Sequence, residues 1–138
     1  MHRPDNPKAY SPIVSRSRRA SLGYALAGWA YMLRYQTNLR IQLVAAALVA
    51  LMALWLGLGA LEWALLLLVV GLNLLLEFIN AALEAVVNLA GPELHPMARV
   101  AKDVAAGAVL LAALLAALVG LLVMGPPLWA RLAGLALR

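Results

Sequence analysis

Four polar side chains stand at helical spacing inside one of the most apolar stretches of the chain. The members of this polar stripe, separated by three, four and four residues, are Glu77, Asn80, Glu84 and Asn88. At roughly 100° per residue they fall within an arc of about 80°, so a helix would carry all four on one face. Carboxylates at such spacing could supply a general base and a ligand for a hard cation.

The depth of the polar stripe follows from the apolar sequence before it. The uncharged run that starts at Trp63 puts Glu77 roughly 21 Å along a helix, and Glu84 about 10 Å further. In a hydrocarbon core of about 30 Å, Glu77 then lies in the inner half and Glu84 at the inner surface. Burial disfavours the charged form of a carboxylate, which suits a base, whereas a carboxylate at the water boundary can hold Mg²⁺.

Acidic residues gather around this stripe. Four of the six acidic residues lie between 77 and 103, namely Glu77, Glu84, Glu93 and Asp103. Lys102 follows in the same region and could meet phosphate or the carboxylates. A base, a metal ligand and a lysine suit phosphate transfer to a lipid hydroxyl. The same side chains would also suit an ion or proton path, or hydrogen bonds between helices, so these alternatives stay open on the residues alone.

The elements that must position these residues are expected to be membrane-spanning helices. The chain has 138 residues, of which 65% are hydrophobic and 12% charged, and a soluble monomer of this size cannot bury that much apolar surface. Three charge-poor runs of spanning length cover residues 43–61, 63–88 and 104–124. The turn and stop residues that we expect to end these helices are Gly57, Gly59, Gly91, Pro92, Gly125, Pro126 and Pro127.

The two ends of the chain are expected to lie outside these spans. Residues 1–20 predict a flexible basic tail, and residues 21–36 predict an amphipathic helix on the membrane surface, with an interfacial load of aromatic side chains. Residues 21–127 would form one domain, followed by a short interfacial segment over 128–138. The third span also repeats small residues every four positions, at Ala108, Ala112, Ala116 and Gly120, which predicts close helix packing or oligomerisation.

Charge distribution and composition narrow the function classes further. The net charge is +5, and seven of the eleven basic residues precede residue 41. No groove-reading motif accompanies this charge, so we expect no nucleic acid as a partner. The positive-inside rule predicts the N-terminus inside and the C-terminus outside. The chain has no cysteine and two histidines, which excludes a disulfide framework and an iron–sulfur cluster and argues against a conventional zinc site.

Three short motifs carry a resemblance to a known family. They are E-F-I-N-A-A-L-E-A-V-V-N at 77–88, E-L-H-P at 93–96 and A-K-D at 101–103. Together with Gly23-Tyr24 and Asn38-Leu-Arg40, they resemble the bacterial integral-membrane diacylglycerol kinase and undecaprenol kinase family over residues 21–125. The resemblance implies a homotrimer in the bacterial inner membrane, with Mg²⁺ and ATP as cofactors. Residues 95–109 resemble the undecaprenol-type branch more than the diacylglycerol-type branch.

The resemblance also implies roles for individual residues. Glu77 would be the general base toward the lipid hydroxyl, with Asn80 shaping the site beside it. Glu84 would bind the catalytic Mg²⁺ that bridges the ATP phosphates, and Lys102 would hold the transferring phosphate. The residues expected around the nucleotide are Tyr24, Glu93, His95 and Asp103.

Three positions depart from the pattern of that family. A metal-binding glutamate of the family falls on Gln36, whose carbonyl oxygen can ligate a cation without adding charge. An aspartate of the family falls on Asn88, and a basic nucleotide contact falls on Ser17. We therefore expect an active lipid kinase with weaker metal affinity. A small channel, a holin-like protein, a transporter subunit or a non-catalytic scaffold are the alternatives, and each predicts indifference to ATP.

Overall fold

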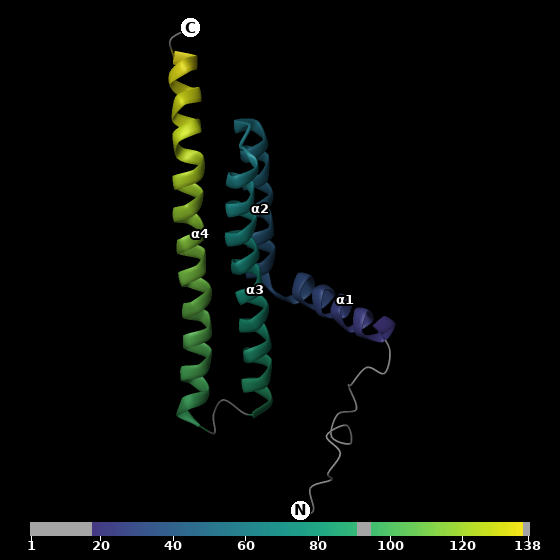
Figure 1. The fold of residues 1–138 in the computed structure, drawn as a ribbon. Helices are drawn as coiled ribbons and strands as arrows, with labels where there is room; N and C mark the ends of the chain where they lie inside the picture. Colours follow the sequence, from purple (N-terminus) through teal and green to yellow (C-terminus); the bar gives the residue numbers. More distant parts are fainter. Residues whose placement is uncertain (1–17, 91–94, 137–138) are drawn as a thin grey trace, which may run out of the picture. The chain divides into compact units, whose positions relative to one another are not determined.

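The computed structural model describes residues 18–90 and 95–136, and every regular element among them is a helix. The helices are α1 (Arg18–Tyr35), α2 (Thr37–Leu56), α3 (Ala60–Ala90) and α4 (Pro96–Ala136) (Figure 1). The chain divides into one compact unit over residues 1–35 and a second over residues 36–138. α2, α3 and α4 are each long and apolar enough to cross a membrane. The predictions of an all-helical protein and of three helices long and apolar enough to span a membrane are therefore confirmed for the described residues.

The first unit holds α1, which begins three residues earlier than the sequence predicted. Its aromatic side chains are exposed, and the rings of Tyr31 and Tyr35 lie 5.0 Å apart between centroids. The Arg34 guanidinium lies 5.6 Å from the centroid of the Tyr35 ring. Rings with a cationic neighbour are typical of a membrane interface. The placement of α1 on a membrane surface stays a prediction.

The second unit begins with the single extended residue that separates α1 from α2. Gln36 has φ −99° and ψ 104°, and α2 starts directly after it, six residues before the uncharged run at Leu43. At its other end α2 stops at Gly57, whose φ of 70° is the left-handed conformation that glycine adopts without strain. The amide of Leu58 then donates to the carbonyl of Ala53 at 3.1 Å. The predicted turn after the first span is confirmed.

The two remaining helices are longer than a membrane is thick. α3 has 31 residues and α4 has 41. At 1.5 Å per residue they measure about 46 Å and 61 Å, against a hydrocarbon core of about 30 Å. α3 ends at Ala90, next to the predicted stop at Gly91 and Pro92. These two helices can therefore carry side chains out of the apolar layer while remaining helical.

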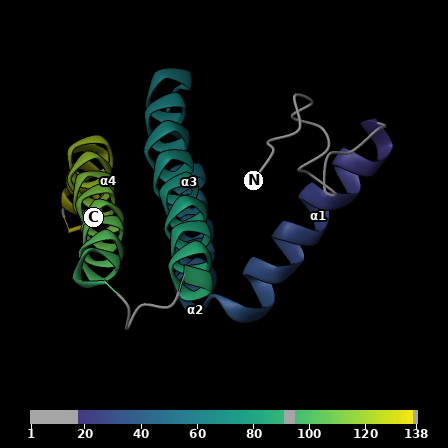
Figure 2. The ribbon, with the colours of Figure 1, turned by 90° about the horizontal axis from the view of Figure 1, so that it is seen from below.

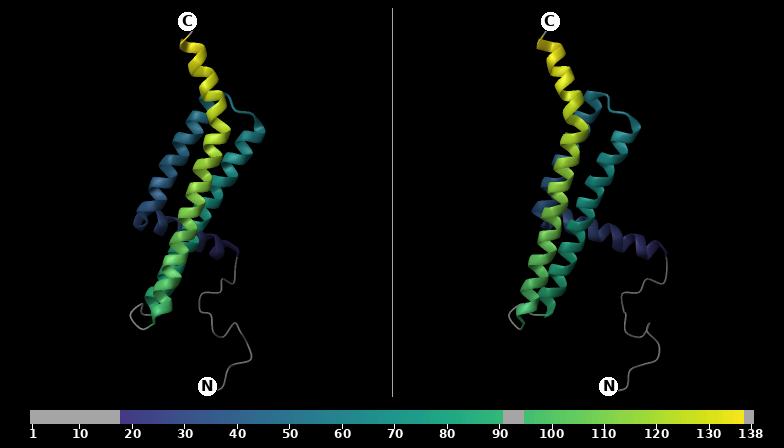
Figure 3. Two further views of the ribbon diagram at one scale, coloured as in Figure 1. Left: turned by 90° about the vertical axis from the view of Figure 1, so that its left-hand side faces the viewer. Right: turned by 60° about the vertical axis from the view of Figure 1, so that its left-hand side comes forward.

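The predicted end of the third span at Gly125-Pro126-Pro127 is wrong, because α4 continues through both prolines to Ala136. Each proline removes its own N–H donor and its ring crowds the carbonyl four residues earlier, which kinks a helix, while Gly125 has no Cβ to clash with the ring that follows it. Transmembrane helices tolerate such residues because no water competes for the remaining backbone hydrogen bonds. The end of α4 bends instead of stopping (Figure 3). Residues 128–136 are thus its last turns, and their interfacial location stays a prediction.

Within this unit α4 packs mainly on α3, and α2 makes fewer contacts with both. The end-on view places α4 to one side of α3 (Figure 2). Ala112 and Gly120 of the small-residue repeat are buried, whereas Ala108 is exposed, so the packing prediction holds for part of the repeat. Most large apolar side chains stay exposed, as expected for helices solvated by lipid.

Candidate active site

Glu77 is the most deeply buried charged residue in the part of the chain that the structure describes. Its exposed fraction is 1%, within the membrane-spanning part of α3. The side-chain amide of Gln42, on α2, donates to Oε2 of Glu77 at 3.3 Å. The side chain of Asn38, one turn earlier on α2, also interacts with the Glu77 carboxylate. The hydrogen bond from Gln42 on the neighbouring helix therefore holds this carboxylate in place.

The other members of the polar stripe become more exposed toward the end of α3. Asn80 is buried, and its side-chain oxygen has no hydrogen-bond partner among the described residues. Glu84 is half-buried and Asn88 is exposed. The depth of the stripe in a membrane stays a prediction. The site combines a buried carboxylate at Glu77 with a less buried one at Glu84, about two turns further along α3.

Glu84 makes no hydrogen bond or ion pair with any described residue, although it interacts electrostatically with Glu77. No group of three His, Cys, Asp or Glu side chains suited to a metal occurs within residues 18–90 and 95–136. Mg²⁺ in phosphate-transfer sites is usually held by one or two carboxylates together with substrate phosphates and water. The Glu84 carboxylate, which has no hydrogen bond or ion pair with a described residue, fits that chemistry. Gln36 is half-buried directly before α2 and makes no capping hydrogen bond, and its part in a metal site stays a prediction.

The first turns of α4 bring Lys102 to the polar stripe. Its ammonium group donates to the side-chain oxygen of Asn88 on α3 at 3.4 Å. Because Asn88 is uncharged, this contact orients Lys102 without neutralising it, and the positive charge remains available to phosphate. Asp103 points elsewhere and forms an exposed pair with Arg99 at 3.9 Å. Such a pair is worth little, so the carboxylate of Asp103 can exchange it for another partner.

His95 has a structural contact that its motif did not reveal. Its Nδ1 accepts a hydrogen bond from the amide of Met97 at 3.2 Å, directly before the first residue of α4. This bond satisfies one of the free amides at the start of the helix. In the neutral ring the proton then sits on Nε2, which faces away from the cap and can donate to an anion.

Not every residue of the predicted site is brought together. Tyr24 is exposed on α1, in the first unit, so its contribution to the site stays a prediction. Ser17 and Glu93 lie outside the described residues. Conversely, Gln42 was not identified from the sequence as a site residue, and Asn38 was named only as part of the family resemblance, with no role at Glu77. Their spacing of four residues, which puts two amides on one helix face, was the available signal.

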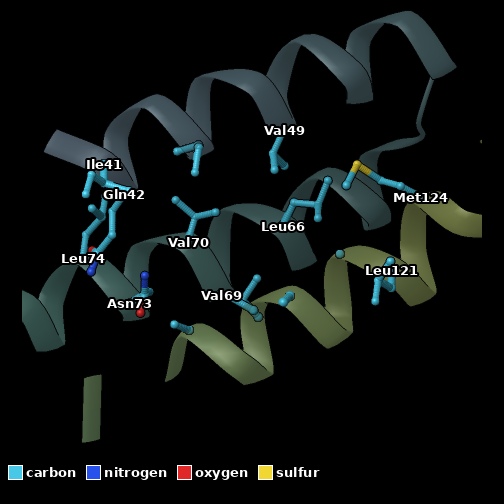
Figure 4. A pocket seen from close by; sticks show the side chains of 16 residues that line it. Ile41, Gln42, Val49, Leu66, Val69, Val70, Asn73, Leu74, Leu121 and Met124 are labelled. Atoms are coloured by element: carbon cyan, nitrogen blue, oxygen red, sulfur yellow. The ribbon is translucent and has the colours of Figure 1, made fainter. Parts of the chain in front are cut away.

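An apolar cavity begins beside Gln42, the hydrogen-bond partner of Glu77, and continues along α3 toward Leu66. It has a volume of about 520 Å³, is partly open, and is lined by residues of α2, α3 and α4 (Figure 4). Gln42 and Asn73 are its two polar lining residues, and both cluster at one end. Gln42 therefore contacts Glu77 with its nitrogen while it also lines the cavity. Small residues of α4, including Ala116 and Gly120, leave this space open.

Comparison with known proteins identifies the family of this chain. Residues 23–124 match the family described as prokaryotic diacylglycerol kinase. A diacylglycerol kinase from Synechocystis is 45% identical over 116 residues, which cover 83% of this chain and 66% of that relative. An undecaprenol kinase from Bacillus subtilis is 36% identical over 95 residues, covering 69% of this chain and 77% of the relative.

A third relative matches a smaller part of this chain. A diacylglycerol kinase from Escherichia coli K12 is 40% identical over 73 residues, covering 53% of this chain and 60% of the relative. Residues 23–124, which match the family, contain α2, α3 and most of α4, and hence every candidate residue of the second unit. The chain therefore belongs to the prokaryotic diacylglycerol kinase family of membrane lipid kinases.

Proposed function

We propose that this protein transfers the γ-phosphate of ATP, in the presence of Mg²⁺, to the primary hydroxyl of a membrane lipid. The lipid is diacylglycerol, giving phosphatidic acid, or undecaprenol, giving undecaprenyl phosphate. The observation that carries the proposal is the buried carboxylate of Glu77, held by Gln42 between an apolar cavity and the polar end of α3. Membership of a family of lipid kinases supports the same reaction.

Glu77 acts as the general base in this proposal. The lipid O–H bond breaks as its oxygen bonds to the γ-phosphorus, the proton passes to the Glu77 carboxylate, and ADP leaves with the electron pair of the broken P–O bond. Gln42 and Asn38 keep the carboxylate fixed, so the base needs no reorientation. Asn80 lies next to Glu77 on the stripe and offers an unpartnered amide oxygen to the reacting groups.

In this proposal, the charged groups near the end of α3 and the start of α4 bind the phosphates. Glu84, with the carbonyl oxygen of Gln36, would hold Mg²⁺, which when bound neutralises the negative charge that develops on the transferring phosphate. Lys102 adds a fixed positive charge for the same phosphate. Gln36 brings no charge, so the affinity for Mg²⁺ should be lower than with two carboxylates.

The nucleotide would be bound at the start of α4. His95 offers an Nε2–H to a phosphate, and Asp103 offers a carboxylate to the nucleoside end. Tyr24, Glu93 and Ser17 complete this set by resemblance alone. We further propose a homotrimer in the bacterial inner membrane, with the N-terminus inside and the C-terminus outside. The concentration of basic residues before residue 41 supports this orientation.

The experiment is phosphate transfer from labelled ATP to diacylglycerol and to undecaprenol, with and without Mg²⁺. Wild-type protein should phosphorylate at least one lipid only when Mg²⁺ is present. Glu84→Gln should lose at least about tenfold in rate and recover part of it at higher Mg²⁺, because the metal loses one charged ligand. A wild-type protein that phosphorylates neither lipid, or a Glu84→Gln variant with an unchanged Mg²⁺ dependence, would contradict the proposal.

A further inference from the structure

Two buried amide oxygens lie at one end of the apolar cavity and have no hydrogen-bond partner among the described residues. They are Oε1 of Gln42, on α2, and Oδ1 of Asn73, on α3. Both residues line the cavity of about 520 Å³, and Figure 4 shows them at its polar end. A buried acceptor without a donor is costly in an apolar interior. The two oxygens therefore need a donor that the described residues do not supply.

The lining of the cavity narrows the choice of donor. Apart from Gln42 and Asn73, it consists of aliphatic side chains, alanines, a glycine and a methionine, and none of these side chains has an N–H or O–H group. The two amides do not serve each other either, because both oxygens are unpartnered. The donor therefore has to be a molecule that enters the cavity.

Water is the molecule that fits the polar end of the cavity. It donates two hydrogen bonds, one for each oxygen, and buried waters typically bind polar groups that would otherwise be unsatisfied. One water needs roughly 10–15 Å³ of such space, so the volume is ample, and the apolar remainder of the cavity offers water no further partner. A lipid hydroxyl has a single hydrogen, and the proposed reaction gives that hydrogen to Glu77.

The orientation of the Gln42 amide gives this water a role. Nε2 of Gln42 donates to Oε2 of Glu77 at 3.3 Å, and Oε1 is the other end of the same amide. If the amide turned over, its oxygen would face the Glu77 carboxylate, and two acceptors would meet. A donor on Oε1 favours the observed orientation and so keeps Nε2 on Glu77. This step rests on the proposed function, in which Glu77 is the base.

We propose that ordered water between Gln42 and Asn73 holds the Gln42 amide toward Glu77, and that Asn73 is thereby a positioning residue for the base. Asn73 lies four residues before Glu77 on α3, so the two side chains share one helix face. Gln42 reaches that face from α2. In this arrangement Asn73 touches neither lipid nor nucleotide and acts only through Gln42.

The first test detects the water directly and needs no kinase activity. The chain has two glutamines, Gln36 and Gln42, so isotope labelling of glutamine side chains gives two amide signals, which Gln42→Leu assigns. Solid-state NMR in phosphatidylcholine bilayers measures magnetisation transfer from water and from lipid chains to the Gln42 amide. Wild type is compared with Asn73→Leu, which removes the amide at similar volume, and with Leu66→Ile, which changes the far end of the same cavity.

We expect transfer from water to the Gln42 amide in wild type and in Leu66→Ile, and its loss in Asn73→Leu. Asn73→Ser, whose hydroxyl oxygen can accept from water, should restore it. A wild-type protein without this transfer, or an Asn73→Leu variant that keeps it, would overturn the inference. Transfer from lipid chains in place of water would show that lipid fills the polar end, and it would overturn the inference as well.

The second test measures lipid phosphorylation from Mg-ATP. Asn73→Leu should lower kcat by about fivefold, the worth of one hydrogen bond, with KM for ATP unchanged, and Asn73→Ser should recover most of the loss. Because Asn73 acts through Gln42, adding Asn73→Leu to Gln42→Leu should cause no further decrease.

The double variant separates positioning from a role in the fold. Losses that multiply when Asn73→Leu and Gln42→Leu are combined would show that Asn73 acts independently of Gln42, and the inference would be overturned. If wild type phosphorylates no lipid, the proposed function itself has failed, and Asn73 has no base to position. The NMR comparison then still decides whether water binds between the two amides.

Discussion

The two ends of the second unit differ in whether their polar side chains have hydrogen-bond partners. At the turn end, near Gly57, Glu62 accepts a hydrogen bond from the amide of Gly59, and Arg131 donates to the carbonyl of Trp55 while stacking 4.8 Å from its ring centroid. At the site end, around Glu77, the buried side-chain oxygens without partners belong to Gln42, Asn73 and Asn80 in the described part of the chain.

This difference separates polar residues that serve the fold from those that serve a ligand. The charges at the turn end satisfy backbone groups that would otherwise be unpaired, so their contacts complete the structure by themselves. The amides at the site end surround a buried carboxylate and an apolar cavity, and they remain incomplete without a further molecule. Substitutions at the site end should therefore change catalysis, and substitutions at the turn end should change stability.

Apart from Glu77 itself, the largest expected effect is at Lys102. Lys102→Met removes the charge proposed to hold the transferring phosphate, and kcat should fall by about 10²–10³, the usual loss for one group that stabilises the transition state. Arg99→Met, on the same helix, removes a cation whose one contact among the described residues is an exposed ion pair with Asp103, and activity should change by less than about threefold. Equal losses in the two variants would show a general effect of charge and contradict the assigned role.

Gln42 should show a smaller effect of the same kind. Gln42→Leu removes the 3.3 Å hydrogen bond to Glu77, and we expect kcat to drop by about tenfold, the worth of one hydrogen bond to a charged group, with KM for ATP unchanged. Val44→Leu, on the exposed face of the same helix, is the control. A raised KM for ATP with an unaltered kcat would show that Gln42 does not position the base.

Two glycine substitutions, one at the turn end and one within α3, should change stability with opposite signs. Gly57→Ala forces a side chain into the left-handed conformation and should destabilise the protein by about 1–2 kcal/mol. Gly71→Ala, within α3 and facing open space, should stabilise it by up to about 1 kcal/mol. Thermal unfolding in detergent measures both, and lipid phosphorylation per folded protein should stay at the wild-type level. A lowered midpoint for both variants would contradict this reading of the turn.

The smallest expected effect is at Arg131. Arg131→Ala removes the contact with Trp55, and the thermal midpoint should decrease by the equivalent of about 0.5–1 kcal/mol, as for a cation over an exposed ring. Kinase activity should be unchanged, because the contact lies at the end of the unit opposite to Glu77. A kinetic defect as large as that of Gln42→Leu would erase the distinction between the two ends.

The sequence predicted the elements well because their signals are local. The three spans follow from apolar length, and the polar stripe of α3 follows from spacing along one helix, so Glu77 and Glu84 could be identified without any contact. The predicted end of the third span at Pro126 was wrong for the same reason. A proline is a reliable local signal in water, and the membrane changes its consequence by protecting the neighbouring hydrogen bonds.

The partners across helices could not be predicted in this way. Gln42 and Asn38 meet Glu77 through the packing of α2 on α3, and helical period along one segment carries no information about which turn of a neighbour it faces. Asn73 was passed over because a single amide in an apolar run has no motif. Its unpartnered side-chain oxygen and its place beside a cavity became visible only once three helices were assembled.

The central claim is that Glu77 is the base of a membrane lipid kinase, and its direct test pairs it with Glu62 on the same helix. Transfer of labelled phosphate from Mg-ATP to diacylglycerol should fall by about 10²–10⁴ in Glu77→Gln, as for loss of a general base. Glu62→Gln, the same substitution at the turn end, should retain wild-type transfer. If Glu77→Gln phosphorylates lipid as fast as Glu62→Gln, the assignment of Glu77 is wrong.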